Sequence, residues 1–282
     1  MLLTDFIRAL EQIVPLSAVG YERDAVGLQV GLPERTELTA ALFAYEVTEK
    51  VIAEAKTRGA NLIVAFHPLI FPSIPAITDR TRTGLLLREL VKNDIALYIQ
   101  HTAFDTHPEF GTSRLMAEAL NLTDIRLLSP LKSDPRYGMG AIGRLSSPVP
   151  SQDLLSLISK TFKTPALRYN ERTPKTIETV AVLGGAGMDF YSSAVLQKAD
   201  AFITADIRYH DFHRADHDKI LLIDVGHAET ERFVTQGMVR AAKTAITAPG
   251  AHIVVNLQTS ILERLLLLAQ TEPNAVHYYH DR

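Results

Sequence analysis

The sequence contains no cysteine. Disulfides, a thiol nucleophile and zinc sites built from thiolates are therefore excluded, and the chain fits a reducing compartment. Any metal site has to be built from nitrogen and oxygen ligands. The ten histidines of the sequence are the obvious source of nitrogen ligands.

Long apolar runs and an excess of charge are missing too. No run approaches the roughly 20 apolar residues that a membrane-spanning helix needs. Residues 1–11 lack a basic lead-in and carry acids among their apolar positions, so we do not expect a secretory signal there. The formal net charge is −3 with both signs interspersed, which gives no footprint for nucleic acid or an anionic membrane. We therefore expect a soluble, cytoplasmic protein with neither as a partner.

The chain has 282 residues, of which 46% are hydrophobic, enough for one large or two medium domains. Apolar runs alternate with segments of helical periodicity, which is typical of α/β layers around largely parallel sheets. Helices are expected over residues 2–14, 48–55, 83–93, 112–120, 151–162, 191–198, 232–242 and 260–270. Strands are expected over 38–47, 61–66, 95–99, 178–183, 201–204, 219–225 and 252–256, and 26–31 is a short strand or loop. Thr48 and Ser151 are expected to cap the helices that follow them.

The middle of the chain differs from the rest. Residues 125–175 are more polar, less regular and rich in proline. We expect a second, smaller α/β unit here, in which residues 138–143 could form an edge strand. The predicted domains are residues 1–125 with 225–282, and residues 126–224.

The stretch Gly226–Glu231 (GHAETE) follows the expected strand 219–225. His227 and Glu231 are four residues apart at the start of a helix, so they project from one helical face. An imidazole and a carboxylate placed in this way can share a metal ion. The alternative is a surface pair near a helix N-terminus, where an acid is favoured by the helix dipole.

Three other expected strands end in residues of the same kinds. Ligands of α/β sheets collect beyond the carboxyl ends of strands, and those ends carry His67, His101 with Asp105, and Asp206 with His210. Histidine with carboxylate and without cysteine suits Zn, Mn, Fe, Co or Mg, and a carboxylate can bridge two ions.

Each of these features also has a structural interpretation. His67 can be a packed loop residue, Asp105 can form an Asx turn, and Asp206 can cap the next segment. The spacing of His210, His213 and His217 also fits a solvated helix face. Residues 184–187 (GGAG) follow a strand but match neither phosphate-binding glycine motif, so a tight turn is favoured.

Five segments together resemble the signatures of the NIF-three-like (Ngg-interacting factor three) family, in the same order. They are residues 26–31 (VGLQVG), 61–71 (NLIVAFHPLIF), 100–105 (QHTAFD), 205–211 (ADIRYHD) and 226–231 (GHAETE). Bacterial members carry the label GTP cyclohydrolase I type 2 homologue. The resemblance runs to about residue 240 and is weaker from about residue 243 onwards. It implies a protomer of two α/β domains, a hexameric ring and a dinuclear metal site between the domains.

The resemblance also assigns ligands. His67 and Asp105 match ligands of one ion, Glu231 matches the glutamate that bridges both ions, and His227 matches a histidine on the other ion. Phe66 stands where the family has a further histidine for that other ion, and phenylalanine has no lone pair to donate. We therefore expect one or two ions per chain, with the second site weakened or empty.

His101 and His210 are the candidates to replace the ligand that Phe66 lacks. Two smaller departures are Ala25, where the family often has asparagine, and Glu46, where it often has aspartate.

Three functions stay open on the sequence. The first is a metal-dependent hydrolase of a nucleotide or another phosphorylated small molecule, with His101 or His210 as the general acid or base. The second is a non-catalytic metal-binding or interaction protein, which the loss of a ligand at Phe66 favours. The third, taken from the family label, is GTP cyclohydrolase activity, a chemistry that is often served by a Cys/His zinc site.

Overall fold

The computed structural model describes residues 1–31, 34, 36–172, 174–247 and 265–270. It divides into two compact units, Met1–Phe104 with Thr235–Ala275 (unit 1) and Asp105–Val234 with Val276–Arg282 (unit 2). The domain limits expected from the sequence stay a prediction. Among the described residues, no helix has the length and apolar character that crossing a membrane requires.

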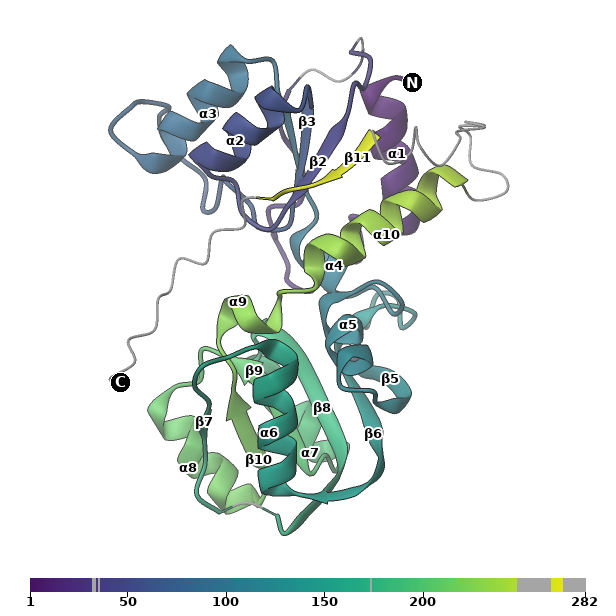
Figure 1. The fold of residues 1–282 in the computed structure, drawn as a ribbon, viewed down its shortest axis with the longest axis vertical. Helices are drawn as coiled ribbons and strands as arrows, with labels where there is room; N and C mark the ends of the chain where they lie inside the picture. The colour runs from purple at the N-terminus through teal and green to yellow at the C-terminus, as the bar shows by residue number, and fades with distance from the viewer. Residues whose placement is uncertain (32–33, 35, 173, 248–264, 271–282) are drawn as a thin grey trace. The chain divides into compact units, whose positions relative to one another are not determined.

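Unit 1 is built on a five-stranded sheet with the order β1-β4-β3-β2-β11 (Figure 1). The strands are β1 (Gly27–Val30), β2 (Ala41–Ala44), β3 (Leu62–Ala65), β4 (Ala96–Ile99) and β11 (Leu266–Leu268). All neighbours are parallel except β1, which runs antiparallel to β4. Every residue of β2, β3 and β4 is buried, as expected for parallel strands covered on both faces.

The helices of unit 1 are α1 (Leu3–Ile13), α2 (Glu49–Thr57), α3 (Arg82–Lys92) and α10 (Val234–Thr247), and α4 (His101–Asp105) follows β4. Figure 1 shows α2 and α3 on one face of the sheet. Leucines of α3 and Val51, Ile52 and Ala55 of α2 pack with Ile63 and Leu97 of the sheet in one apolar core. Thr48 caps α2 as expected, because its hydroxyl accepts the N–H of Val51 at 3.2 Å.

Unit 2 has a six-stranded sheet with the order β5-β6-β8-β9-β10-β7. The strands are β5 (Thr123–Pro130), β6 (Gly138–Pro150), β7 (Arg168–Tyr169), β8 (Thr176–Ala186), β9 (Ala201–Ala205) and β10 (Leu221–Asp224). The pairs β8–β9 and β9–β10 are parallel, and the other three pairs are antiparallel. The carboxyl ends of β8, β9 and β10 therefore lie at one edge of the sheet.

Helices cover both faces of this sheet. They are α5 (Thr112–Ala119), α6 (Ser151–Phe162), the 3₁₀ turn η2 (Met188–Phe190), α7 (Tyr191–Leu196), α8 (Tyr209–Asp218) and α9 (His227–Thr230). One core joins α5 and α6 to the strand residues of one face, including Val180 and Ile203. A second core joins α7 and α8 to the opposite face, including Ala181 and Phe202.

Two expectations for the middle of the chain are wrong. Residues 138–143 do not form an edge strand, because β5 pairs with β6 on its outer side. The polar sequence of β5 has no clear strand pattern, so its pairing with β6 could not be predicted from the sequence. Ser151 is not a side-chain cap of α6. Its hydroxyl instead donates to the carbonyl of Pro174.

The helix expected over 260–270 is also wrong where the structure describes it. Leu266–Leu268 form β11, which pairs in parallel with Ala41–Phe43. A short run of leucines fits a helix and a buried strand equally well, and the open edge of β2 decides in favour of the strand. Residues 260–264 and the strand expected over 252–256 lie outside the described residues.

Candidate functional site

In unit 1 the polar residues that follow β3 and β4 lie side by side. The two strands are parallel neighbours, and the rings of His67 and His101 have centroids 5.7 Å apart. Each imidazole places its Nδ1 against a carboxylate. Nδ1 of His67 lies 3.2 Å from Oε2 of Glu46, whose other oxygen lies 3.8 Å from the guanidinium of Arg82.

His101 has the stronger partner. Its Nδ1 lies 2.7 and 2.9 Å from the two oxygens of Asp24, a carboxylate with only 2% of its side chain exposed. The hydroxyl and N–H of Thr102 also donate to Asp24, at 2.5 and 3.2 Å. Burial raises the pKa of Asp24, but the hydrogen bonds from His101 and Thr102 outweigh it and the net pKa is lowered. Asp24 is therefore an anion that orients His101.

The backbone of His101 is strained. Its φ is +30°, a conformation that side-chain-bearing residues rarely adopt and that often marks functional sites. Because Asp24 can only accept, Nδ1 of His101 carries a proton, and Nε2 of the neutral ring is left as an acceptor or a metal ligand.

Phe66 forms the apolar wall of this cluster. It is fully buried, and its ring lies 5.7 Å from that of His101, 4.9 Å from that of His67 and 6.5 Å from that of Phe104. The side chain at this position packs against both histidines and offers no ligand atom.

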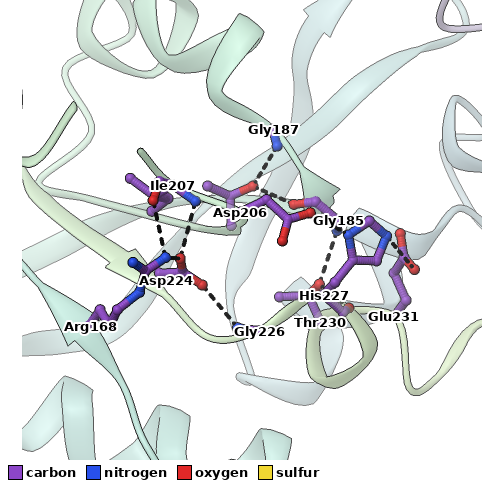
Figure 2. A network of polar contacts seen from close by, with 11 residues as sticks. Arg168, Gly185, Gly187, Asp206, Ile207, Asp224, Gly226, His227, Thr230 and Glu231 are labelled. Carbon is purple, nitrogen blue, oxygen red and sulfur yellow. Dashed lines mark hydrogen bonds and ion pairs between the residues drawn. The ribbon is translucent and has the colours of Figure 1, made fainter. Parts of the chain in front are cut away.

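In unit 2, His227 lies between two carboxylates (Figure 2). Its Nδ1 is 2.6 Å from Oδ2 of Asp206, and its Nε2 is 3.2 Å from Oε2 of Glu231. The hydrogen bond to Glu231 raises the pKa of His227 most; partial burial opposes it, Asp206 adds to it, and the pKa reaches about 10. The predicted contact between His227 and Glu231, four residues apart, is thus present, although α9 ends at Thr230 and α10 starts separately at Val234.

Gly185 provides the space in which this group sits. It has φ +66°, and a Cβ added to it would lie 2.5 Å from Oε1 of Glu231 and 3.2 Å from the ring of His227. Its N–H donates to the hydroxyl of Thr230, and its carbonyl accepts from the hydroxyl of Thr204, which also accepts the N–H of Gly187. The tight turn expected over residues 184–187 is wrong for most of this segment, because Gly184–Ala186 are the last residues of β8, and Gly185 there makes room for a carboxylate and an imidazole.

A buried carboxylate fixes the two loops that carry Asp206 and His227. Asp224 ends β10, and its oxygens accept the N–H of Ile207 and of Gly226, both at 3.1 Å. Arg168 pairs with the same carboxylate and also donates to the carbonyl of Ile207 at 3.0 Å. Figure 2 shows this network to the left of Asp206 and His227.

The remaining predicted residues lie elsewhere in unit 2. Asp105 ends α4 with its Oδ1 removed from solvent, and it lines a pocket of about 290 Å³ together with Arg114 and Arg126. His210 lies on the exposed side of α8, with its ring 5.3 Å from that of Tyr209 and 6.5 Å from that of His213.

The donor atoms fit a divalent cation. His67 in unit 1, and His227 with Glu231 in unit 2, are residues that could hold a metal ion. Imidazole and carboxylate without thiolate suit borderline or hard ions. A methyl group at position 185 would lie 2.5 Å from Oε1 of Glu231, so the glycine allows this carboxylate to lie next to His227.

Most of the chain matches a known protein family. A family model described as Duf34/NIF3 (NGG1p interacting factor 3) matches residues 1–260. The chain belongs to this family. Among its relatives, a Streptomyces coelicolor protein named GTP cyclohydrolase 1 type 2 homolog is 35% identical over 234 residues, which cover 81% of each chain.

Solved structures of other proteins share the fold. A hypothetical protein of Staphylococcus aureus has a TM-score of 0.86 at 24% identity, and a Bacillus cereus protein related to NIF3 has a TM-score of 0.85 at 21% identity. Each match covers 99% of this chain and 99% of the other chain. The mixed α/β architecture with two sheets is thereby confirmed.

The sequence does not reveal the carboxylates that orient His67 and His101. Asp24 precedes the VGLQVG segment and is 77 residues from His101, so no local spacing connects them. Glu46 was noted only as a departure from the family. Asp224 lies inside the expected strand 219–225, and its polar side chain within an apolar run is the signal that could have identified it.

Proposed function

We propose that the protein is a metal-dependent hydrolase in which His67, Asp105, His227 and Glu231 together hold one divalent ion firmly. The family resemblance places His227 on a second ion, whereas we propose one shared ion because His67, His227 and Glu231 form one group of possible metal ligands. The residue types support this, since two imidazoles and two carboxylates are a common ligand set for Zn, Mn, Fe or Co. A second ion would need a further ligand at position 66, where a buried phenylalanine stands. The second site is therefore proposed to be weak.

The observation that carries catalysis rather than metal storage is the pair formed by Asp24 and His101. A carboxylate can orient a metal-ligating histidine as well as a general base, but His101 is not among the four proposed ligands, and its strained backbone is typical of a functional residue. With Nδ1 donating to Asp24, His101 is set to take a proton at Nε2. His210 remains the second candidate for the acid or base, and its exposed position on α8 is the weaker support.

The ion, when bound, supplies positive charge that polarises a carbonyl or phosphoryl oxygen. The protein supplies the orientation: Glu46 faces Nδ1 of His67, Asp206 faces Nδ1 of His227, and Gly185 leaves room for Glu231. The pocket that reaches Asp105 carries two arginines, which is the chemistry for a phosphorylated substrate.

The test is a substrate panel of nucleotides and other phosphate esters, assayed with Mn²⁺, Co²⁺ and Zn²⁺. His101→Gln is expected to lower turnover at least about 100-fold while keeping its metal, because only the proton acceptor is lost. Glu231→Gln is expected to lose both turnover and metal. Turnover that both variants retain would contradict the proposal.

Two other outcomes have a clear meaning. Tight metal binding without turnover of any substrate would favour a non-catalytic metal-binding protein. GTP belongs in the panel because relatives are named GTP cyclohydrolase 1 type 2 homolog, and a formyl-pterin product would assign that activity. The hexamer implied by the resemblance is also a proposal, and sedimentation equilibrium of the full chain tests it.

A further inference from the structure

We infer that Asp206 is a positioning residue that fixes His227 as a metal ligand through Nε2, without binding the ion itself. This inference rests on the proposed metal site and concerns a residue that the sequence offers only as a possible ligand or cap and to which the family match assigns no role. It starts from the short contact of 2.6 Å between Oδ2 of Asp206 and Nδ1 of His227.

The first step concerns the proton on the imidazole. An ionised carboxylate can only accept a hydrogen bond, so Nδ1 of His227 has to carry a proton when it faces Asp206. A cation would then replace the proton on the other nitrogen, Nε2, which lies 3.2 Å from Oε2 of Glu231. Asp206 thus selects the nitrogen that shares a side with the second ligand.

The second step separates positioning from ligation. The two nitrogens of an imidazole point away from each other, so a carboxylate bonded to Nδ1 lies on the opposite side of the ring from an ion bound to Nε2. Figure 2 shows this arrangement, with Asp206 on one side of His227 and Glu231 on the other. Asp206 is therefore placed behind the ligand rather than beside the ion.

The third step concerns the backbone, which holds Asp206 and His227 in place for their contact. Asp206 has φ +55°, and the next N–H, that of Ile207, donates to the buried Asp224 at 3.1 Å. The same carboxylate accepts the N–H of Gly226, the residue before His227. One buried anion therefore holds both loops, and Arg168 pairs with it.

The fourth step predicts that loss of the Asp206 carboxylate changes metal affinity but not the stability of the fold. The side chains of Asp206 and His227 are 55% and 39% exposed, and ion pairs so open to solvent contribute little to folding. Partners that orient a metal-ligating histidine, in contrast, commonly change metal affinity 10- to 100-fold. A loss of affinity without a loss of stability distinguishes positioning from a structural role.

The experiment titrates the full-length chain with Co²⁺, following the visible absorption of the bound ion, and records thermal unfolding of the same samples. Asp206→Ala is expected to weaken Co²⁺ binding about 10- to 100-fold with an unchanged unfolding midpoint. Asp206→Asn keeps an acceptor oxygen and is expected to restore part of the affinity. Asp189→Ala, which removes the same charge from an exposed position of unit 2, is expected to bind like the native chain.

His227→Ala distinguishes the two ways of failing. If His227→Ala loses the ion but Asp206→Ala binds Co²⁺ with native affinity, the role of Asp206 is wrong and the metal site stands. If His227→Ala itself binds like the native chain, the proposed site is wrong and the inference falls with it.

Discussion

The histidine clusters of unit 1 and unit 2 share one arrangement of an imidazole and a carboxylate, but in different surroundings. In both, a carboxylate faces Nδ1 of an imidazole that follows a parallel strand. In unit 1 the orienting Asp24 is buried and held by Thr102, and Phe66 closes the cluster with an apolar wall. In unit 2 the orienting Asp206 is exposed, and His227 faces a second carboxylate, Glu231.

The difference indicates a division of roles. Two carboxylates around one imidazole concentrate negative charge, which favours a cation. A single buried carboxylate behind an imidazole suits proton transfer at the opposite nitrogen. Under the proposed function, His227 with Glu231 is therefore the stronger cation-binding group, and His101 is the better acid or base.

The largest predicted effect concerns the space beside Glu231. Gly185→Ala would place a Cβ 2.5 Å from Oε1 of Glu231 at a backbone φ of +66°. We expect metal affinity to fall at least about 10-fold, because the ligand has to move. We also expect a stability loss of about 1–3 kcal/mol, which urea unfolding measures.

Gly59→Ala is the matched control. Gly59 has a similar φ of +68°, but nothing lies within 4 Å of an added Cβ. It should cost about 1 kcal/mol through the backbone alone and leave metal binding unchanged. Equal metal affinities in the two variants would show that the space beside Glu231 is not required.

The second prediction concerns the buried anion of unit 1. Asp24→Asn should cost about 1.5–3 kcal/mol at neutral pH, since hydrogen bonds to a buried charge are lost. The pKa of Asp24 is lowered in the folded state, so its stabilisation is present above pH ~4 and is lost as the pH falls through the folded pKa.

Urea unfolding of the native chain and of Asp24→Asn between pH 7 and pH 3 measures the difference between their free energies of unfolding. It should shrink below pH ~4. Asp134→Asn is the control, because the pKa of Asp134 is also lowered, but by Arg136 at an exposed position, and its replacement should leave stability unchanged. A difference between native and Asp24→Asn that grows towards low pH would contradict the assignment of Asp24 as an anion.

The third prediction concerns position 66, where the phenylalanine of unit 1 offers no ligand atom. Phe66→His adds an imidazole next to His67 and His101 and should raise the metal content from about one to about two ions per chain. Burying a polar ring where Phe66 is fully buried should cost about 1–2 kcal/mol. Elemental analysis and urea unfolding measure the two effects, and a metal content that stays at one ion would contradict the role given to Phe66.

The smallest predicted effect is at Gln100, between β4 and His101. Its side chain is fully buried, and in the described part of the chain neither its amide oxygen nor its nitrogen has a hydrogen-bond partner. Gln100→Met should therefore keep stability or raise it by up to about 1 kcal/mol, as urea unfolding measures. Destabilisation by more than that would show that the amide has a structural task.

Features encoded locally were predictable from the sequence. The cap at Thr48 and the pairing of His227 with Glu231 depend on residues three and four positions apart, and both are present. Features that depend on distant partners were not. Asp24 meets His101 only after the sheet of unit 1 has formed, and Leu266–Leu268 become a strand only because β2 has an open edge. Elements with weak patterns, such as β5, take their structure from the neighbour with which they pair.

The proposed function depends on His67 and His227 being ligands of the same ion. The direct measurement is the metal content per chain of protein purified without chelator or affinity metal, for the native chain, His67→Ala and His227→Ala. His213→Ala serves as the control for ions bound at exposed histidines of α8. The account predicts about one ion in the native chain and in His213→Ala, and loss of that ion in both other variants. An ion retained in full by either His67→Ala or His227→Ala would contradict it.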